Sequence, residues 1–355
     1  MAPEFTKIAE MLEKEIRNGT YMDTLPSISR LSELLGVCPA TVKRILSLLR
    51  DRDLVSGEHG RCVRVNPKAA GNPHFHRNVV FLADLSSMAT PVFSRILDRL
   101  IGLLSSKYIC THVFVSAEQA RECDFEPDCL VVINSREMKV IFNELLERYP
   151  GCGGIVINMP SSQYSSVMGD GEAAGFEALR HLAEDCGHTH IGILATQLGY
   201  PQACFARRCR GARMYAQKNP HIRLSMAEVP ELAYCGQESF RLMGELMSKD
   251  PEITAVFAVC DMLALGVYGY VAANCLRMPE DIAVIGFDNL DFCTALTPQL
   301  TTFSEDIVQS ADCLLTLICN ILSGKKEIQE YLISPRLIVR GSTVKGKVSV
   351  NNQPC

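Results

Sequence analysis

Polar side chains follow several short apolar runs in the second part of the sequence. Asp84 and Ser86 follow one run, and Asp288 and Asn289 follow another, in a stretch where no clear helix begins. Carboxylates, amides and hydroxyls offer donors and acceptors in fixed directions, which a polyhydroxylated ligand needs. We therefore expect a ligand site that includes Asp288. Asp261, which also follows an apolar run, is expected instead to cap the helix after it.

A second set of polar residues lies near the N-terminus, on one predicted helix. Apolar residues recur at helical spacing between positions 42 and 49, which leaves Thr41, Lys43 and Arg44 on the opposite side. Lysine and arginine can neutralise phosphates or donate to guanine, and threonine can bond a phosphate or contact a thymine methyl group. This helix face therefore has the chemistry of a DNA-reading surface.

Three predicted helices and a hairpin surround that face. The predicted elements are helices near residues 5–18, from Ser27 to Gly36 and from Pro39 onward, then strands at Leu54-Val55 and Cys62-Val63-Arg64-Val65. Leu34 is expected on the buried face of the second helix. Two short helices joined by a tight glycine turn and followed by a hairpin form a winged helix-turn-helix. An ordinary three-helix packing unit is the alternative that this pattern leaves open.

The N-terminal region resembles the GntR family of bacterial transcription regulators. The resemblance rests on Ile16-x-x-Gly19-x-Tyr21, Leu25-Pro26-Ser27 and Leu35-Gly36-Val37-x-x-Ala40-Thr41-Val42-Lys43-Arg44. It implies that the third helix enters the major groove and that the wing touches the minor groove. The residues that it assigns to DNA are Ser27, Arg30, Thr41, Lys43, Arg44 and Arg61. For Arg30 and Arg61, a solvated surface charge is the alternative.

From Asn78 onward, short apolar runs alternate with amphipathic helical segments. This alternation predicts an α/β fold in which parallel sheets are covered by helices. About 270 residues of the pattern are long for one sheet, so we expect two lobes. Open parallel sheets bind ligands at the carboxyl ends of their strands, and two facing lobes form a cleft there. That cleft is the expected place of the ligand site.

Nearly all of residues 78–343 resemble the effector-binding domain of the LacI/GalR family. The motifs are Arg208-x-x-Gly211, Asp261-Met262-x-Ala264-x-Gly266, Met278-Pro279-Glu280-Asp281-Ile282, Gly286-Phe287-Asp288 and Pro298-x-Leu300-Thr301-Thr302. The resemblance implies the periplasmic-binding-protein type I architecture, with two lobes, three crossovers and a small molecule, usually a sugar, in the cleft. The ligand contacts that it implies are Arg208, Tyr234, Cys260, Asp288 and Glu305. A salt bridge without a ligand is the alternative for Arg208 and Asp288.

The expected domain boundaries follow from these patterns. Residues 1–66 form the winged helix-turn-helix, 67–77 a linker rich in proline and glycine, 78–345 the effector-binding domain and 346–355 a tail. Lobe 1 is expected over about 78–160 and 294–324, and lobe 2 over about 161–293 and 325–345.

Composition excludes several classes of protein. The 355 residues are 47% hydrophobic and 21% charged, as in globular chains and unlike disordered ones. No apolar stretch approaches the roughly 20 residues of a membrane span, and the first residues lack a secretion signal, so we expect a soluble cytoplasmic protein. The 16 cysteines are scattered without a C-x-x-C spacing. We expect them to be buried apolar residues, with no metal or cofactor.

Charge is divided unevenly along the chain. Residues 1–65 hold 10 basic and 9 acidic residues, whereas residues 78–355 hold 23 and 31. A small, slightly basic N-terminal piece joined to an acidic body fits a nucleic-acid reader attached to another domain. The two resemblances together imply a repressor whose binding to double-stranded operator DNA is controlled by a small carbohydrate, and one reading helix per chain predicts a homodimer. The pairing of the two regions resembles arabinose-responsive repressors. An extracytoplasmic sugar-binding protein and a carbohydrate-active enzyme with two carboxylates are the alternatives; we do not expect an enzyme.

Overall fold

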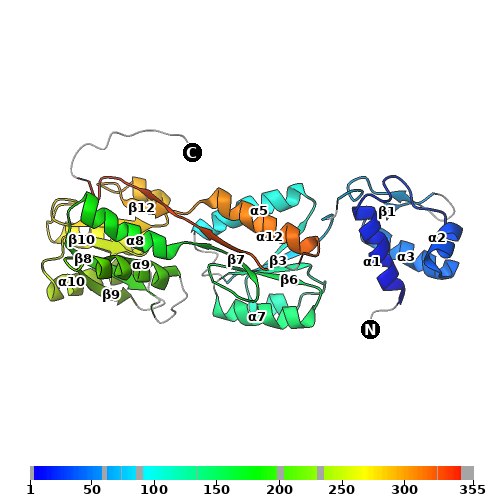
Figure 1. The fold of residues 1–355 in the computed structure, drawn as a ribbon, viewed down its shortest axis with the longest axis horizontal. Helices are drawn as coiled ribbons and strands as arrows, with labels where there is room; N and C mark the ends of the chain where they lie inside the picture. Colours follow the sequence, from blue (N-terminus) through cyan, green and yellow to red (C-terminus); the bar gives the residue numbers. More distant parts are fainter. Residues whose placement is uncertain are drawn as a thin grey trace.

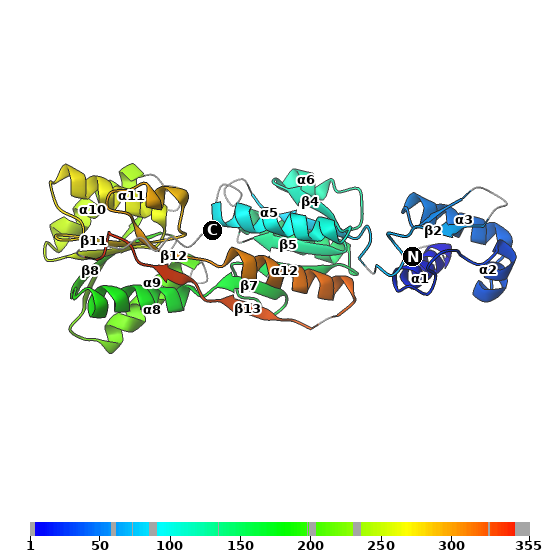
Figure 2. The same cartoon turned by 90° about the horizontal axis from the view of Figure 1, so that it is seen from above.

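The chain folds into three units in a row: an N-terminal helical unit, a first lobe and a second lobe (Figure 1). The view from above shows the same order (Figure 2). This computed structural model describes residues 4–57, 62–72, 74–84, 91–133, 135–196, 198, 204–229, 236–325 and 327–344. None of the helices described there is long and apolar enough to cross a membrane.

The N-terminal unit confirms the predicted helix-turn-helix and hairpin. Its elements are α1 (Glu4–Arg17), α2 (Ile28–Leu35), α3 (Pro39–Asp51), β1 (Val55–Ser56) and β2 (Arg64–Val65). Gly36 ends α2 in the left-handed conformation, with φ of 64°, which a residue without Cβ adopts at little cost. The strands β1 and β2 pair antiparallel. The expected burial of Leu34 is wrong, because its side chain is 54% exposed, on the outer side of α2.

The expected linker is packed rather than extended. Within the described part of residues 67–77, Ala69 and Phe75 are buried in the core of the N-terminal unit. The amide of His76 donates a hydrogen bond of 2.8 Å to the carbonyl of Tyr108, which lies in the first lobe. Two apolar side chains among polar neighbours give no periodic signal, so the sequence pattern does not reveal this packing. The segment therefore connects the two units through ordered contacts.

The first lobe is built on a parallel sheet. Its strands, in spatial order, are β13 (Glu330–Ile333), β7 (Ser165–Gly169), β6 (Gly153–Ile157), β5 (Cys129–Ile133), β3 (Asn78–Leu82) and β4 (Cys110–Phe114). Along β3, Val79 and Phe81 pack in one core cluster, whereas Val80 and Leu82 pack in the other. Both faces are therefore covered, as buried parallel strands require. The helices are α5 (Pro91–Ser106) and α12 (Ile307–Leu322) on one face, and α6 (Ala117–Arg121) and α7 (Arg136–Arg148) on the other.

The second lobe repeats this arrangement. Its strands, in spatial order, are β14 (Arg336–Ile338), β12 (Thr301–Ser304), β11 (Ala283–Phe287), β10 (Ala255–Ala258), β8 (His190–Thr196) and β9 (Arg223–Val229). All neighbours are parallel except β12 and β14. The helices are α8 (Gly171–Arg180), which continues as the π-helix η1 (His181–Asp185), α9 (Cys204–Lys218), α10 (Gly236–Lys249), α11 (Asp261–Ala273) and the 3-10 helix η2 (Asp291–Thr294).

The chain crosses between the lobes three times: after β7, after β12, and between β13 and β14. The crossings lie at different residues from those expected. The strands β7 and β13 belong to the first sheet instead of the second lobe, and β12 belongs to the second sheet instead of the first lobe. These strands are four or five residues long. The strand β7 contains two serines, and β12 contains two threonines and a serine. Neither strand therefore shows the continuous apolar run that predicts a buried strand.

Candidate functional site

The helix α9, which carries Arg208, is held against α8 by two glycines. A Cβ atom at Gly175 would lie 1.8 Å from the carbonyl oxygen of Arg208, and one at Gly211 would lie 1.9 Å from that of Glu172. No side chain fits at either place, so the backbones of the two helices are in direct contact. This contact fixes the position of Arg208 relative to α8 and the crossing that precedes it.

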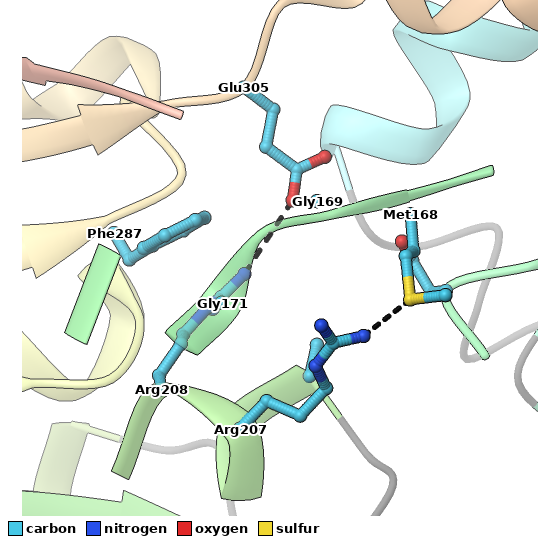
Figure 3. Close-up of a pocket in the computed structure, with 9 residues that line it drawn as sticks. Met168, Gly169, Gly171, Arg207, Arg208, Phe287 and Glu305 are labelled. Carbon is cyan, nitrogen blue, oxygen red and sulfur yellow. Dashed lines mark hydrogen bonds and ion pairs between the residues drawn. The ribbon is translucent and has the colours of Figure 1, made fainter. Parts of the chain in front are cut away.

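Arg208 lies at the centre of a buried polar cluster. Its side chain is 4% exposed, and Nη1 donates a hydrogen bond of 2.7 Å to the carbonyl of Val259 at the end of β10. Nη2 lies 3.8 Å from Oδ1 of Asp288 and 3.7 Å from Oε1 of Glu305. The guanidinium carbon lies 3.3 Å from the ring centroid of Phe287, which is the stacked arrangement that arginine favours (Figure 3).

Asp288 is held in an unusual backbone conformation by its neighbour Asp261. Asp288 follows β11 with φ of 117°, which few residues other than glycine adopt. The buried carboxylate of Asp261 accepts hydrogen bonds from the amide of Leu290 at 2.9 Å and from Thr302 Oγ1 at 2.6 Å. A Cβ at Gly286 would lie 2.1 Å from this carboxylate. The expectation that Asp261 caps a helix is wrong, because its side chain positions the loop after β11.

Burial dominates the electrostatics of the cluster. It raises the pKa of Asp288 well above its ordinary value; Arg208 opposes this rise, and the carboxyl groups of Asp261 and Glu305 add to it. Burial also raises the pKa of Glu305, again against the attraction of Arg208. A single guanidinium therefore balances two carboxyl groups that burial makes reluctant to ionise. Hydroxyl groups of a ligand can donate to these carboxyl oxygens and accept from the guanidinium.

A small cavity lies beside the cluster, where the lobes meet. The residues that line it are Asn158, Met168 and Gly169 from the first lobe, Gly171, Cys204, Arg207, Arg208 and Phe287 from the second, and Glu305 from the crossing after β12. Its volume of about 10 Å³ gives room for about one water molecule. A ligand of the size of a sugar therefore needs the lobes or their side chains to move apart.

Three of the expected ligand residues, Arg208, Asp288 and Glu305, come together in one cluster, of which Arg208 and Glu305 line the cavity and Asp288 does not. Cys260 is buried just before α11, but it does not line the cavity. Asp84 follows β3 in the first lobe and is also absent from the lining. Ser86 and Tyr234 lie outside the described residues.

The sequence analysis missed two side chains of the lining that come from neighbouring positions. Phe287 is the last residue of β11, directly before Asp288, and Arg207 directly precedes Arg208. A search of the positions next to each candidate for aromatic and basic side chains finds both. Met168 lies on β7, which was not predicted, so no comparable signal identifies it.

The expected DNA-reading residues lie on α2 and α3. Lys43 and Arg44 are exposed on α3, and neither forms an ion pair within the residues that the structure describes. Ser27 caps α2 by accepting a hydrogen bond from the amide of Arg30. The Arg30 side chain pairs with Glu33 at 2.9 Å. Lys43 and Arg44 are thus free for phosphates, whereas Arg30 has a local partner.

The remaining two DNA-reading candidates differ in how well they are placed. The hydroxyl of Thr41 lies 3.3 Å from Sγ of Cys38, at the start of α3. Arg61 lies outside the described residues. Contact of any of these residues with DNA stays a prediction.

Known proteins resemble the body of the chain. Residues 179–343 match the family model of the periplasmic binding protein-like domain. The HTH-type transcriptional repressor PurR of Haemophilus influenzae (strain PittGG) is 30% identical over 172 residues, which cover 47% of this chain and 50% of that protein. The chain thus spans about half the length of the curated relatives it matches.

Solved structures share the fold. A LacI family transcriptional regulator from Enterococcus faecium with bound ribose has a TM-score of 0.64 at 24% identity, covering 76% of this chain and 100% of that one. The transcriptional regulator CelR in its cellobiose complex has a TM-score of 0.62 at 18% identity, covering 90% and 100%. These named relatives are transcriptional regulators rather than enzymes. The two-lobed body of this chain therefore shares the fold of these solved structures, and residues 179–343 of it match the periplasmic binding protein-like domain.

Proposed function

We propose that this protein is a cytoplasmic transcription regulator, acting as a repressor, whose binding to operator DNA is controlled by a small carbohydrate. The N-terminal unit acts as a winged helix-turn-helix of the GntR type, and the two-lobed body binds the carbohydrate. The observation that carries the proposal is the cluster of Arg208, Asp288 and Glu305, buried where the lobes meet, in the same chain as a helix-turn-helix.

The cluster suits a polyhydroxylated ligand because it combines donors and acceptors with a stacked ring. Arg208 donates, while the carboxyl groups of Asp288 and Glu305 accept or donate according to their protonation. Arg208 and Asp288 belong to the second lobe and Glu305 to a crossing between lobes, while first-lobe residues line the adjacent cavity. A ligand held between them changes the free energy of lobe closure. The relatives with bound ribose and cellobiose support this ligand class.

The proposed DNA-binding form is a homodimer. One α3 offers few phosphate contacts, so a single N-terminal unit binds DNA weakly. Two units related by a two-fold axis read two half-sites of a palindromic operator. The ligand then acts by changing the spacing or orientation of the two units, which couples the cleft to DNA by about 1–3 kcal/mol.

Two measurements test the proposal together. The purified protein is first screened by thermal shift against arabinose, ribose, hexoses, disaccharides and sugar phosphates, with Asp288→Ala as the control. A ligand of the folded state raises the melting temperature of the wild type and not of the variant. DNA fragments selected in vitro are then titrated by fluorescence anisotropy with and without that ligand. A protein that selects no DNA sequence, or whose DNA affinity ignores a bound sugar, contradicts the proposal.

A further inference from the structure

Arg207 presents a second guanidinium to the cavity, on the side opposite to Arg208. It reaches toward the first lobe, where Nη1 donates to the sulfur of Met168 (Figure 3). A thioether is a weak acceptor and carries no charge. The Nε group is buried and has no hydrogen-bond partner in the described part of the chain. The side chain of Arg207 is 12% exposed, so water replaces little of the hydrogen bonding that the buried Nε group lacks.

The nearby carboxylates are already engaged by other arginines. Glu172 Oε1 lies 3.8 Å from Nε of Arg207, without a hydrogen bond, and accepts from Arg210 Nε at 3.0 Å and from Arg210 Nη2. Asp288 and Glu305 face Arg208 instead, and of these two carboxyl groups only Glu305 lines the cavity. Among the described residues, Arg207 is therefore a largely buried cation without a hydrogen-bonded anion, which is unfavourable in the empty protein.

Part of the cavity wall next to Arg207 is glycine backbone. Gly171 approaches Arg207 so closely that a Cβ there would lie 3.3 Å from the Cβ of Arg207. Gly169 faces Glu305, whose Oε1 would lie 2.8 Å from an added Cβ. Neither position has a side chain that separates a ligand from the guanidinium, and both glycines line the cavity. An incoming group can thus reach Arg207 and Arg208 at the same time.

We propose that the effector is an acidic carbohydrate, whose carboxylate or phosphate binds Arg207 while its hydroxyl groups bind Arg208, Asp288 and Glu305. This inference rests on the proposed function of the body as a carbohydrate-binding domain. The planar guanidinium of arginine matches both anions with two parallel hydrogen bonds, which are about twice as strong as neutral ones. Burial raises the pKa of Asp288 and of Glu305, which reduces their repulsion of an anion.

The test compares neutral sugars with their acidic derivatives by isothermal titration calorimetry on the full chain. The probes are ribose, ribonate and ribose 5-phosphate, then glucose, gluconate and glucose 6-phosphate, with arabinose and inorganic phosphate added. We expect an acid to bind at least about tenfold more tightly than its neutral parent, the equivalent of about 1.4 kcal/mol. The carboxylate and phosphate derivatives separate the two sources of the anion, and inorganic phosphate shows whether the anion alone suffices.

The Arg207→Gln variant is expected to lose the preference for the acid, while Arg207→Lys keeps part of it. Arg210→Gln is the matched control, because Arg210 lies on the same helix and is 42% exposed. Melting curves show whether each variant folds. Equal affinity for acid and parent, or a preference that survives in folded Arg207→Gln, overturns this inference and leaves the proposed function intact. If the wild type melts cooperatively and yet binds none of the sugars, both this inference and the proposed function are overturned.

Discussion

The carboxyl group of Asp288, which we propose binds the ligand, lowers the stability of the folded protein. Burial raises its pKa, and the neighbouring carboxyl groups add to the effect of burial. Because the pKa is higher in the folded state than in the unfolded state, ionisation favours unfolding. The contribution of the protonated Asp288 to the free energy of unfolding is therefore present below about pH 4 and is lost as the pH rises toward the folded-state pKa. The loop held by Asp261 keeps the group in place despite this cost.

The variant Asp288→Asn removes the ionisable group and keeps its shape. We expect its melting temperature to exceed that of the wild type by about 2–4 °C at pH 8, which corresponds to about 1 kcal/mol for a domain of this size. The difference should vanish near pH 4, and sugar affinity should fall. Differential scanning calorimetry across this pH range measures the effect. The control is Asp312→Asn, which replaces a half-exposed carboxylate on α12. An Asp288→Asn variant that is less stable than the wild type at pH 8 would contradict the argument.

Lys43 and Arg44, which are both exposed on α3, are the residues through which the proposed DNA binding is tested most directly. If each neutralises one phosphate, the double variant Lys43→Ala, Arg44→Ala binds DNA more weakly. The slope of log affinity against log salt then becomes shallower by about 1.8. Anisotropy titrations at several salt concentrations measure this slope. The control is the double variant Lys7→Ala, Lys14→Ala on α1, which removes the same charge and should leave the slope closer to that of the wild type. Equal slopes in the two double variants would contradict the assignment of α3 as the DNA-reading helix.

At the scale of elements, the contact between α8 and α9 decides where the binding arginines lie. A methyl group at Gly211 meets the backbone of α8, which no side-chain rotation can relieve. We expect Gly211→Ala to destabilise the protein by about 1–3 kcal/mol and to weaken sugar binding, as measured by urea unfolding and calorimetry. Gly102→Ala on α5 is the control, because nothing lies within 4 Å of its added Cβ. It should stabilise its helix by about 0.5–1 kcal/mol.

The elements also show what the sequence can predict. An amphipathic helix such as α3 follows from the period of its apolar residues, and a buried strand such as β5 follows from its continuous apolar run. The strands β7 and β12 do not, because they contain serine and threonine, whose side chains form hydrogen bonds that become visible only in the folded sheet, such as those of Ser165 and Thr301. The role of Asp261 was also hidden, since its partners Leu290 and Thr302 lie 29 and 41 residues away. Arg208 was identified through a motif and Asp288 also through its place after an apolar run, whereas Arg207 was overlooked although it directly precedes Arg208.

At the scale of the whole molecule, the segment 67–77 connects the N-terminal unit to the first lobe within one chain. Phe75 is buried against the helical unit, while its ring lies 5.8 Å from that of Tyr108 in the first lobe. The carbonyl of Tyr108 also accepts from the amide of His76. Lys68 lies over the Tyr108 ring at 5.6 Å. These contacts form an ordered joint, so a movement of the first lobe displaces the N-terminal unit.

The variant Tyr108→Asn tests this joint without opening the core of either unit. Tyr108 is 45% exposed and has φ of 59°, a conformation that asparagine tolerates. Removal of the ring should leave the affinity for sugar and the DNA affinity of the ligand-free protein within about twofold. In the wild type, we expect the ligand to change the DNA affinity by about 5–150-fold. In the variant, the ratio of DNA affinities with and without ligand should lie several-fold closer to one. Anisotropy titrations, with and without the sugar found by thermal shift, measure that ratio. An unchanged ratio would show that the ligand acts on DNA binding by a route that does not depend on this joint, such as rearrangement between two copies of the chain.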